Sequence, residues 1–214
     1  MATDAKAQEE KRSFPHKYED ILKDFGASND SSSPAKVPSK VKYPGIFDQP
    51  KKKRYWVDRE GNNCFVLYAR ALTITFGEDD RYWRWNPVYA ASSVYVDAAE
   101  LLDVLSLEVK GDFETAYLTP GTVYEVSYII MMKDPKYGWE DKVEFSVTPP
   151  QNLQIVPRNS TLDLRTKGRW WSYVRVAEFT TSPGQSGRMY FMLRQTVGKW
   201  KKGLVIKGVD ITPK

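Results

Sequence analysis

The residues best suited to chemistry lie together between Leu72 and Trp85, in the sequence LTITFGEDDRYWRW. An alternating apolar segment is followed there by three acids at 78–80 and then by an aromatic cluster. A sugar has an apolar face of C–H groups and a rim of hydroxyls, so its pocket needs a flat aromatic ring beside a few fixed polar groups. This segment supplies both. Trp83 and Trp85, two apart on one strand face, could equally fill the protein core.

Groups that would support catalysis are scarce. The single histidine, His16, lies far before the segments that read as folded, so a Ser/His or Cys/His nucleophile would lack its base, and a histidine metal site would lack its ligands. The acids at 78–80 and 140–141 could form a glycosidase pair. Both groups, however, lie in turn-like segments where acids are usually solvated. We therefore expect no enzymatic activity, no cofactor and no metal site.

Positive charge is concentrated at the end of the chain. The net charge is +5, and residues 165–214 contain eleven Lys or Arg against two acids, Glu178 and Asp210. Such a surface can neutralise phosphates, with exposed aromatic rings stacking on bases, or it can simply keep a protein soluble. RNA binding is therefore the alternative function, although no motif of a known RNA-binding fold is apparent.

The single cysteine, Cys64, excludes an intramolecular disulfide and suits a reducing compartment. It begins an apolar run, so it is either a buried small hydrophobe or the site of a disulfide to a second chain. Residues 1–11 are polar and charged, and nowhere does an apolar stretch reach the roughly eighteen residues of a membrane span. We expect a cytoplasmic or nuclear protein with no membrane span.

Residues 1–54 have the composition of a flexible Lys/Pro/Ser-rich extension, which we expect to be disordered, rather than that of a domain. One short amphipathic helix is predicted by apolar residues three and four apart, namely Tyr18, Ile21, Leu22 and Phe25. This helix has no partner within the segment. The run KKKR at 51–54 could act as a nuclear import signal or contact phosphate. Alternatively, it is a solvated stretch before the folded domain.

From residue 55 onward the pattern is that of short strands. Apolar and polar residues alternate with period two, and Gly or Pro residues separate the segments. Strands are predicted at residues 72–76, 105–110, 124–132, 143–147, 174–176, 189–193 and 204–211, and only 97–103 reads as a helical turn. Many short strands without a long helix predict an all-β fold, an antiparallel β-sandwich or jelly roll, over residues 55–214.

Two separated motifs resemble a known family. The stretch FVLYARALTITF at 65–76, followed by YWRW at 82–85, resembles the opening motif of the phloem protein 2 family, the Nictaba-like plant lectins. The stretch KWKKGLVIKGVDI at 199–211 resembles the C-terminus of that family, and residues 105–111 and 124–133 fit its middle strands. The resemblance covers residues 55–214 in order, and it implies a jelly-roll lectin domain behind a variable N-terminal extension.

The resemblance also implies a function and a site. Members are non-enzymatic lectins of the plant phloem cytosol that bind N-acetylglucosamine oligomers, such as chitin fragments and N-glycan cores, and often form dimers; defence is one use of such a lectin. Their sugar site would fall here on Phe76 and Trp83, with Trp85 close by. Where this chain has Phe76, family lectins often carry Trp, a larger stacking surface.

Each candidate residue has an expected role. We expect Trp83 to stack on a sugar ring, Phe76 to form a second apolar wall and Tyr82 to offer its hydroxyl. Four further candidates are Trp85, Arg84, Lys199 and Trp200. Trp85 would support the site, and Arg84 would reach sugar hydroxyls or remain exposed. Lys199 and Trp200 would contribute to the sugar site from near the end of the sheet. Alternatively, Lys199 is a solvated residue and Trp200 is a core residue.

Overall fold

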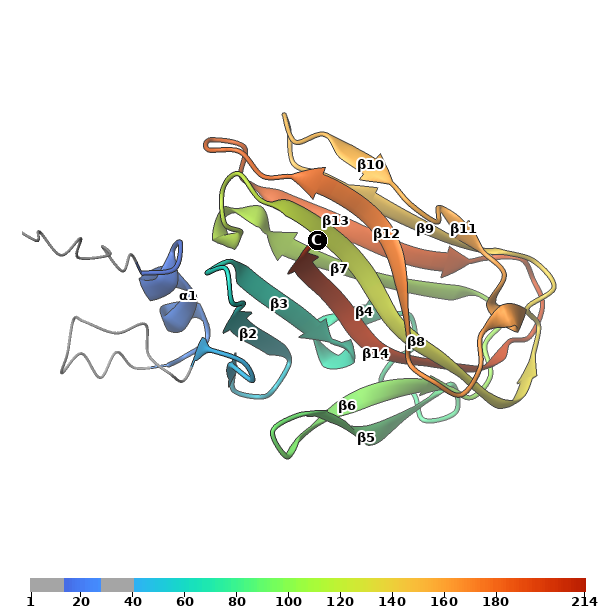
Figure 1. The fold of residues 1–214 in the computed structure, drawn as a ribbon. Helices are drawn as coiled ribbons and strands as arrows, with labels where there is room; N and C mark the ends of the chain where they lie inside the picture. Colours follow the sequence, from blue (N-terminus) through green and yellow to red (C-terminus); the bar gives the residue numbers. More distant parts are fainter. Residues whose placement is uncertain (1–13, 28–40) are drawn as a thin grey trace, which may run out of the picture.

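The computed structural model describes residues 14–27 and 41–214, and they form two antiparallel β-sheets packed face to face (Figure 1). The larger sheet contains β1 (Ile46–Phe47), β2 (Lys53–Val57), β3 (Asn63–Tyr68), β5 (Trp83–Ala91), β6 (Val94–Leu101), β8 (Val123–Tyr137), β10 (Ile155–Pro157), β12 (Ser172–Thr180) and β14 (Lys202–Pro213). The smaller sheet contains β4 (Thr73–Ile74), β7 (Leu107–Glu114), β9 (Val143–Thr148), β11 (Thr161–Leu162) and β13 (Arg188–Gln195). The prediction of an all-β sandwich is confirmed.

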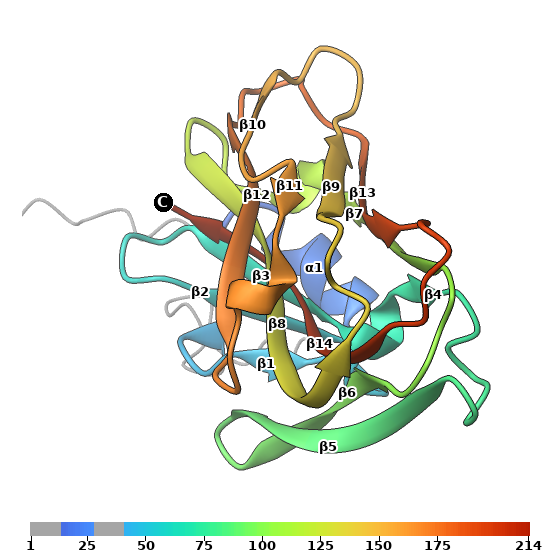
Figure 2. The same ribbon diagram turned by 90° about the vertical axis from the view of Figure 1, so that its right-hand side faces the viewer.

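The last strand lies in the middle of the larger sheet. The order of strands there is β1-β2-β3-β14-β8-β12-β10, and β6, with β5 beyond it, also pairs with β14. Figure 2, which looks at one end of the sandwich, shows this sheet on one side and β9, β13, β7 and β4 on the other. The C-terminal motif therefore holds the centre of the fold, flanked by β3 and by β8.

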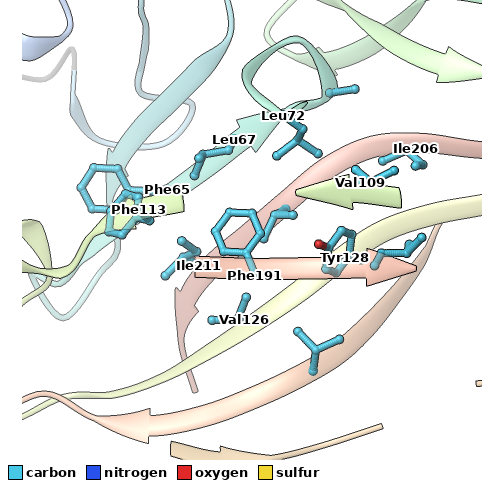
Figure 3. Packing of buried hydrophobic residues seen from close by; sticks show 14 of the residues in the cluster. Phe65, Leu67, Leu72, Val109, Phe113, Val126, Tyr128, Phe191, Ile206 and Ile211 are labelled. Carbon is cyan, nitrogen blue, oxygen red and sulfur yellow. The ribbon is translucent and has the colours of Figure 1, made fainter. Parts of the chain in front are cut away.

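The core lies between the two sheets and follows from the period-two pattern (Figure 3). On β8, alternate residues from Tyr124 to Ile130 are fully buried, and from the smaller sheet Val109 and Phe191 meet them. Alternation places one face of each strand inward. Burying a large apolar side chain contributes roughly 1.5–3 kcal/mol, so these strands are held together chiefly by their inward faces.

Helix α1 (Tyr18–Asp24) is formed, as predicted, but it does not lack a partner. Its apolar residues are buried in the main core, where the ring of Phe25 lies 6.1 Å from that of Tyr55 on β2. The amide Nδ2 of Asn63 donates to the carbonyl of His16 at 2.7 Å and so ties this segment to β3. A flexible extension is thus the wrong description for residues 14–27 and 41–54, because strands β2 and β3 supply the missing apolar surface. The remaining parts of residues 1–54 lie outside the described residues.

Three short 3₁₀ helices complete the described elements: η2 (Ala69–Ala71), η3 (Thr115–Tyr117) and η4 (Leu164–Thr166). None of the helices within residues 14–27 and 41–214 is long and apolar enough to cross a membrane.

Residues 97–103 are not a helical turn, because most of them belong to β6, which forms a hairpin with β5. Ser92 and Ser93 connect the two strands, both with positive φ, as a tight hairpin turn requires. Ala99 pairs with Trp85 on one side and with Ile206 of β14 on the other. Pairing on both sides outweighs a weak local preference for helix.

Candidate functional site

The aromatic loop, residues 75–82, joins β4 to β5 and carries the main candidate residues. The amide of Gly77 donates to the carbonyl of Ile74 at 2.9 Å, and the amides of Tyr82 and Trp83 both donate to the carbonyl of Asp79 at 3.0 Å. Phe76 has a φ of 60°, which is uncommon for a residue other than glycine. The side chain of Phe76 is 58% exposed, so this tight loop presents the ring to solvent.

The indole groups of Trp83 and Trp85 hold the backbone of the aromatic loop through hydrogen bonds. The Nε1 group of Trp83 donates to the carbonyl of Thr75 at 3.0 Å, and that of Trp85 donates to the carbonyl of Gly77 at 2.9 Å. Trp83 is only 2% exposed and lies in the core, so it has no ring face to offer to a sugar. The stacking role expected of Trp83 is therefore wrong, and the alternative of a core residue describes it. Trp85 is partly buried against the core, and its hydrogen bond to Gly77 holds the loop backbone.

An aromatic surface is formed by Phe76, which is exposed, and Tyr82, which is partly buried against the core. Their ring centroids lie 5.2 Å apart with the planes tilted by 42°, so the two rings form one bent apolar surface. The guanidinium of Arg81 lies 5.3 Å from the Tyr82 ring centroid. This kind of surface suits a sugar ring, because the C–H groups of the sugar pack against aromatic faces.

Charged groups form a fixed rim around the aromatic surface. Arg81 donates to Asp79, with Nη2 at 2.6 Å from Oδ2, and this bond holds the pKa of the Asp79 carboxyl below its usual value. The guanidinium of Arg70 lies 3.6 Å from the Trp85 ring centroid and bridges Glu78 at 3.2 Å and Asp97 at 3.1 Å. The rim thus offers ionised acceptors and cationic donors at positions that their own ion pairs fix.

Arg84 belongs to a different surface. It pairs across the strands with Glu100, while Trp83 and Trp85 occupy the other face of β5. Glu100 accepts from Lys133 at 2.8 Å and from Asn86 at 2.6 Å. Arg84 is exposed, which matches one of its two expected outcomes, but it does not project toward the aromatic loop.

Lys199 and Trp200 lie on the loop that precedes β14. Lys199 Nζ is 3.0 Å from Asp141 Oδ2, and Trp200 is 53% exposed, so Trp200 is not a core residue. Residues 102–104 lie between the two loops, because the amide of Leu102 donates to the Tyr82 carbonyl and Val104 pairs with Lys201. We therefore describe Lys199 and Trp200 as a neighbouring patch.

Lys201 organises that neighbouring loop and was not singled out from the sequence. Its ammonium is fully buried and donates to the carbonyls of Leu105, Val197 and Lys199, each at 2.7 Å. Burial lowers the pKa of Lys201. Nothing in the sequence separates Lys201 from the adjacent lysines, so only the structure assigns it this role.

The basic run at 51–54 is partly engaged within the fold. Arg54 is buried against three aromatic rings, with its guanidinium 4.3 Å from the Trp56 ring centroid, and its Nε donates to the Pro44 carbonyl at 2.7 Å. The Nζ atom of Lys53 lies 3.3 Å from Oδ2 of Asp24. Arg54 is therefore not available to an import receptor or to a phosphate while the domain is folded.

Cys64 is buried in β3 and only 2% exposed. Burial raises the pKa of its thiol, which keeps the sulfur protonated and unreactive. A disulfide to a second chain would require β3 to open.

These features define a β-sandwich protein with an exposed phenylalanine, paired with a partly buried tyrosine, on a loop that two indole hydrogen bonds hold in place. Residues 62–213 match the family model of Phloem protein 2. The chain belongs to the phloem protein 2 family.

Two relatives match this chain over most of its length. Protein PHLOEM PROTEIN 2-LIKE A1 of Arabidopsis thaliana is 38% identical over 203 residues, which cover 94% of this chain and 81% of that protein. A protein named Lectin from Luffa acutangula is 37% identical over 207 residues, which cover 93% of this chain and 94% of that protein.

Among solved structures, the CBM22-1 and GH10 modules of Clostridium thermocellum Xyn10B match with a TM-score of 0.37 and 12% identity, over 69% of this chain and 27% of that chain. A similarity this low says nothing about what the present chain binds.

Proposed function

We propose that this protein is a lectin that binds N-acetylglucosamine oligomers, such as chitin fragments and N-glycan cores, through the aromatic loop. The observation that carries the proposal is the exposed Phe76 ring, paired with the partly buried Tyr82, on a backbone fixed by two indole hydrogen bonds. A site whose shape is fixed before binding loses less entropy when the ligand arrives. The name of the Luffa acutangula relative supports the same class of function.

The chemistry of the aromatic loop suits this ligand. One ring of Phe76 or Tyr82 would pack against the C–H face of a sugar, and the other against the methyl of its acetamido group. Glu78 would accept hydrogen bonds from hydroxyls, and Arg81 would donate to the acetamido oxygen. Both side chains are held by ion pairs, to Arg70 and to Asp79, and need little reordering.

We further propose that the protein acts without catalysis, in the cytosol of phloem cells. The support for a binding role is the aromatic surface itself and the family to which the chain belongs. Glu78 and Asp79, two of the three acids of the aromatic loop, are bound to arginines, and that pairing favours ionised acceptors over a proton donor for hydrolysis.

The test is calorimetric titration with chitotriose of wild type and of Phe76→Ala. Losing one stacking ring should cost about 1–3 kcal/mol, on the scale known for bases stacked on aromatic side chains, which is roughly five- to hundredfold weaker binding. Tyr190→Ala, which removes a 56% exposed ring from the smaller sheet, is the matched control and should bind as wild type does. Unchanged affinity of a folded Phe76→Ala protein would exclude the loop as the site.

A further inference from the structure

The outer face of the larger sheet carries a row of polar side chains that the aromatic loop does not explain. Strand register places Arg54, Asp210, Ser127 and Arg175 in one row across β2, β14, β8 and β12, with the apolar Val66 of β3 between Arg54 and Asp210. These residues face away from the main core, because their neighbours along each strand face into it. Figure 1 shows the strands in this order, in front of β13 and β7.

A hollow of about 670 Å³, widely open to solvent, lies over the end of this row that Asp210, Ser127 and Arg175 form, and we call it the outer hollow. Its floor includes Ser127 and Asp210, and Asn159 lines it from the segment after β10. Tyr173 is the aromatic residue among those that line it, and its side chain is 62% exposed. The outer hollow therefore combines an accessible ring with polar groups, and its volume lies in the range of small-ligand sites.

The charges of the outer hollow balance. Its lining includes three acids, Glu125, Glu178 and Asp210, and three bases, Arg158, Arg175 and Lys214. Most of them neutralise one another, since Arg175 lies 2.8 Å from Glu125, and Arg158 and Lys214 both lie 3.1 Å from Glu178. A balanced lining gives no net attraction to a polyanion or to a cation. It favours a neutral ligand that both donates and accepts hydrogen bonds.

Two buried carboxylate oxygens of the outer hollow lack partners among residues 14–27 and 41–214, namely Glu125 Oε1 and Asp210 Oδ1. Burial raises the pKa of Asp210 to about 7, while the nearby Arg54 lowers it. Both oxygens are closed off from solvent, so ligand hydroxyls would bond instead to the accessible polar groups of the lining, with the exposed guanidinium of Arg175 as a donor.

We propose that the outer hollow is a second carbohydrate site, which binds a neutral oligosaccharide with one sugar ring packed on Tyr173 and its hydroxyls bonded to Ser127, Asp210 and Arg175. The proposal goes beyond the function of the aromatic loop and does not depend on it. Figure 2 shows β12 and β8 on the opposite side of the sandwich from β4, where the aromatic loop begins. One chain would then hold two glycans at once, which raises its avidity for a surface that displays many.

The test is an NMR titration of the Phe76→Ala protein, in which the proposed loop site is disabled, with chitotriose, cellotriose and mannotriose in turn. We expect at least one of them to shift the amide signals of Ser127, Tyr173 and Arg175 in a saturable way. Tyr173→Ala in the same background should weaken that binding about five- to hundredfold, whereas Tyr173→Phe should largely retain it because the ring remains. Tyr190→Ala should change nothing.

Two results would overturn the proposal. One is that none of the three sugars, at millimolar concentration, shifts these amide signals in a protein whose spectrum is that of a folded chain. The other is that Tyr173→Ala binds the same sugar as tightly as its parent. Because the parent already carries Phe76→Ala, failure of the loop site alone leaves this experiment unaffected. Shifts caused only by an RNA oligonucleotide and abolished by salt would likewise contradict a neutral ligand.

Discussion

Replacing Trp83 with phenylalanine separates a supporting role from a ligand-binding role. The change removes the indole donor and leaves the Thr75 carbonyl, now bonded at 3.0 Å, without its partner. An orphaned, partly buried polar group costs about 1–3 kcal/mol. The smaller ring also leaves a void in the core, which adds on the order of 1 kcal/mol. We expect the free energy of unfolding to fall by about 2–4 kcal/mol, measured by urea denaturation.

A thermal melt gives a second measure of the same change. For a chain of this size each 1 kcal/mol corresponds to roughly 2–4 °C, so the melting temperature should fall by roughly 4–16 °C. Trp170→Phe is the matched control, because Trp170 is 85% exposed and such surface changes usually stay within about 0.5 kcal/mol. A Trp83→Phe protein with unchanged stability but no affinity for chitotriose would refute the supporting role and restore the stacking role.

Two further perturbations test other parts of the fold. Gly138→Ala should lower the free energy of unfolding, measured in urea, by more than about 1 kcal/mol, because Gly138 has a φ of 79° and an added Cβ would meet the Trp200 carbonyl oxygen. Stability equal to wild type would show that the two segments are not packed this way. Asp210→Asn should change how stability depends on pH. Burial raises the folded-state pKa of Asp210 to about 7. Between about pH 4 and 7 the folded chain therefore holds a proton that the unfolded chain has released. The contribution of Asp210 to stability falls as the pH rises through that window. Thermal melts from pH 4 to 8 should show a smaller fall in the variant, and identical profiles would contradict the buried carboxyl.

The sequence was a good guide to the strands that bury one face. Period-two alternation predicted β8, β13 and β14 closely, because an antiparallel strand with one buried face must alternate. The pattern was weaker where contacts distant in sequence decide the outcome. Residues 97–103 look helical by themselves, yet pairing with β5 and β14 makes most of them a strand. Helix α1 was predicted, but its partners on β2 and β3 lie too far along the chain for a local pattern to reveal.

The sequence singled out the segment that holds the candidate site, but it did not predict that Trp83 is a core residue while Phe76 is exposed. Trp83 is the more attractive stacking residue by type, and Phe76 offers the smaller ring. Alternation places Trp83 and Trp85 on one face of β5, yet it does not say whether that face looks toward solvent or toward the core. The tertiary packing decides this, and it buries Trp83 while the positive φ of Phe76 turns the smaller ring outward. The sequence thus gives the proposed segment, and only the packing shows which of its rings are exposed.

The most direct test of the central claim, that the Phe76–Tyr82 pair binds sugar, is calorimetric titration of wild type and Phe76→Ala with chitotriose at low and moderate salt. We expect saturable binding by wild type that salt leaves unchanged, because a neutral sugar releases no counterions, and weaker binding by the variant. Absence of heat from a folded wild-type protein, or equal affinity of the two proteins, would contradict the claim.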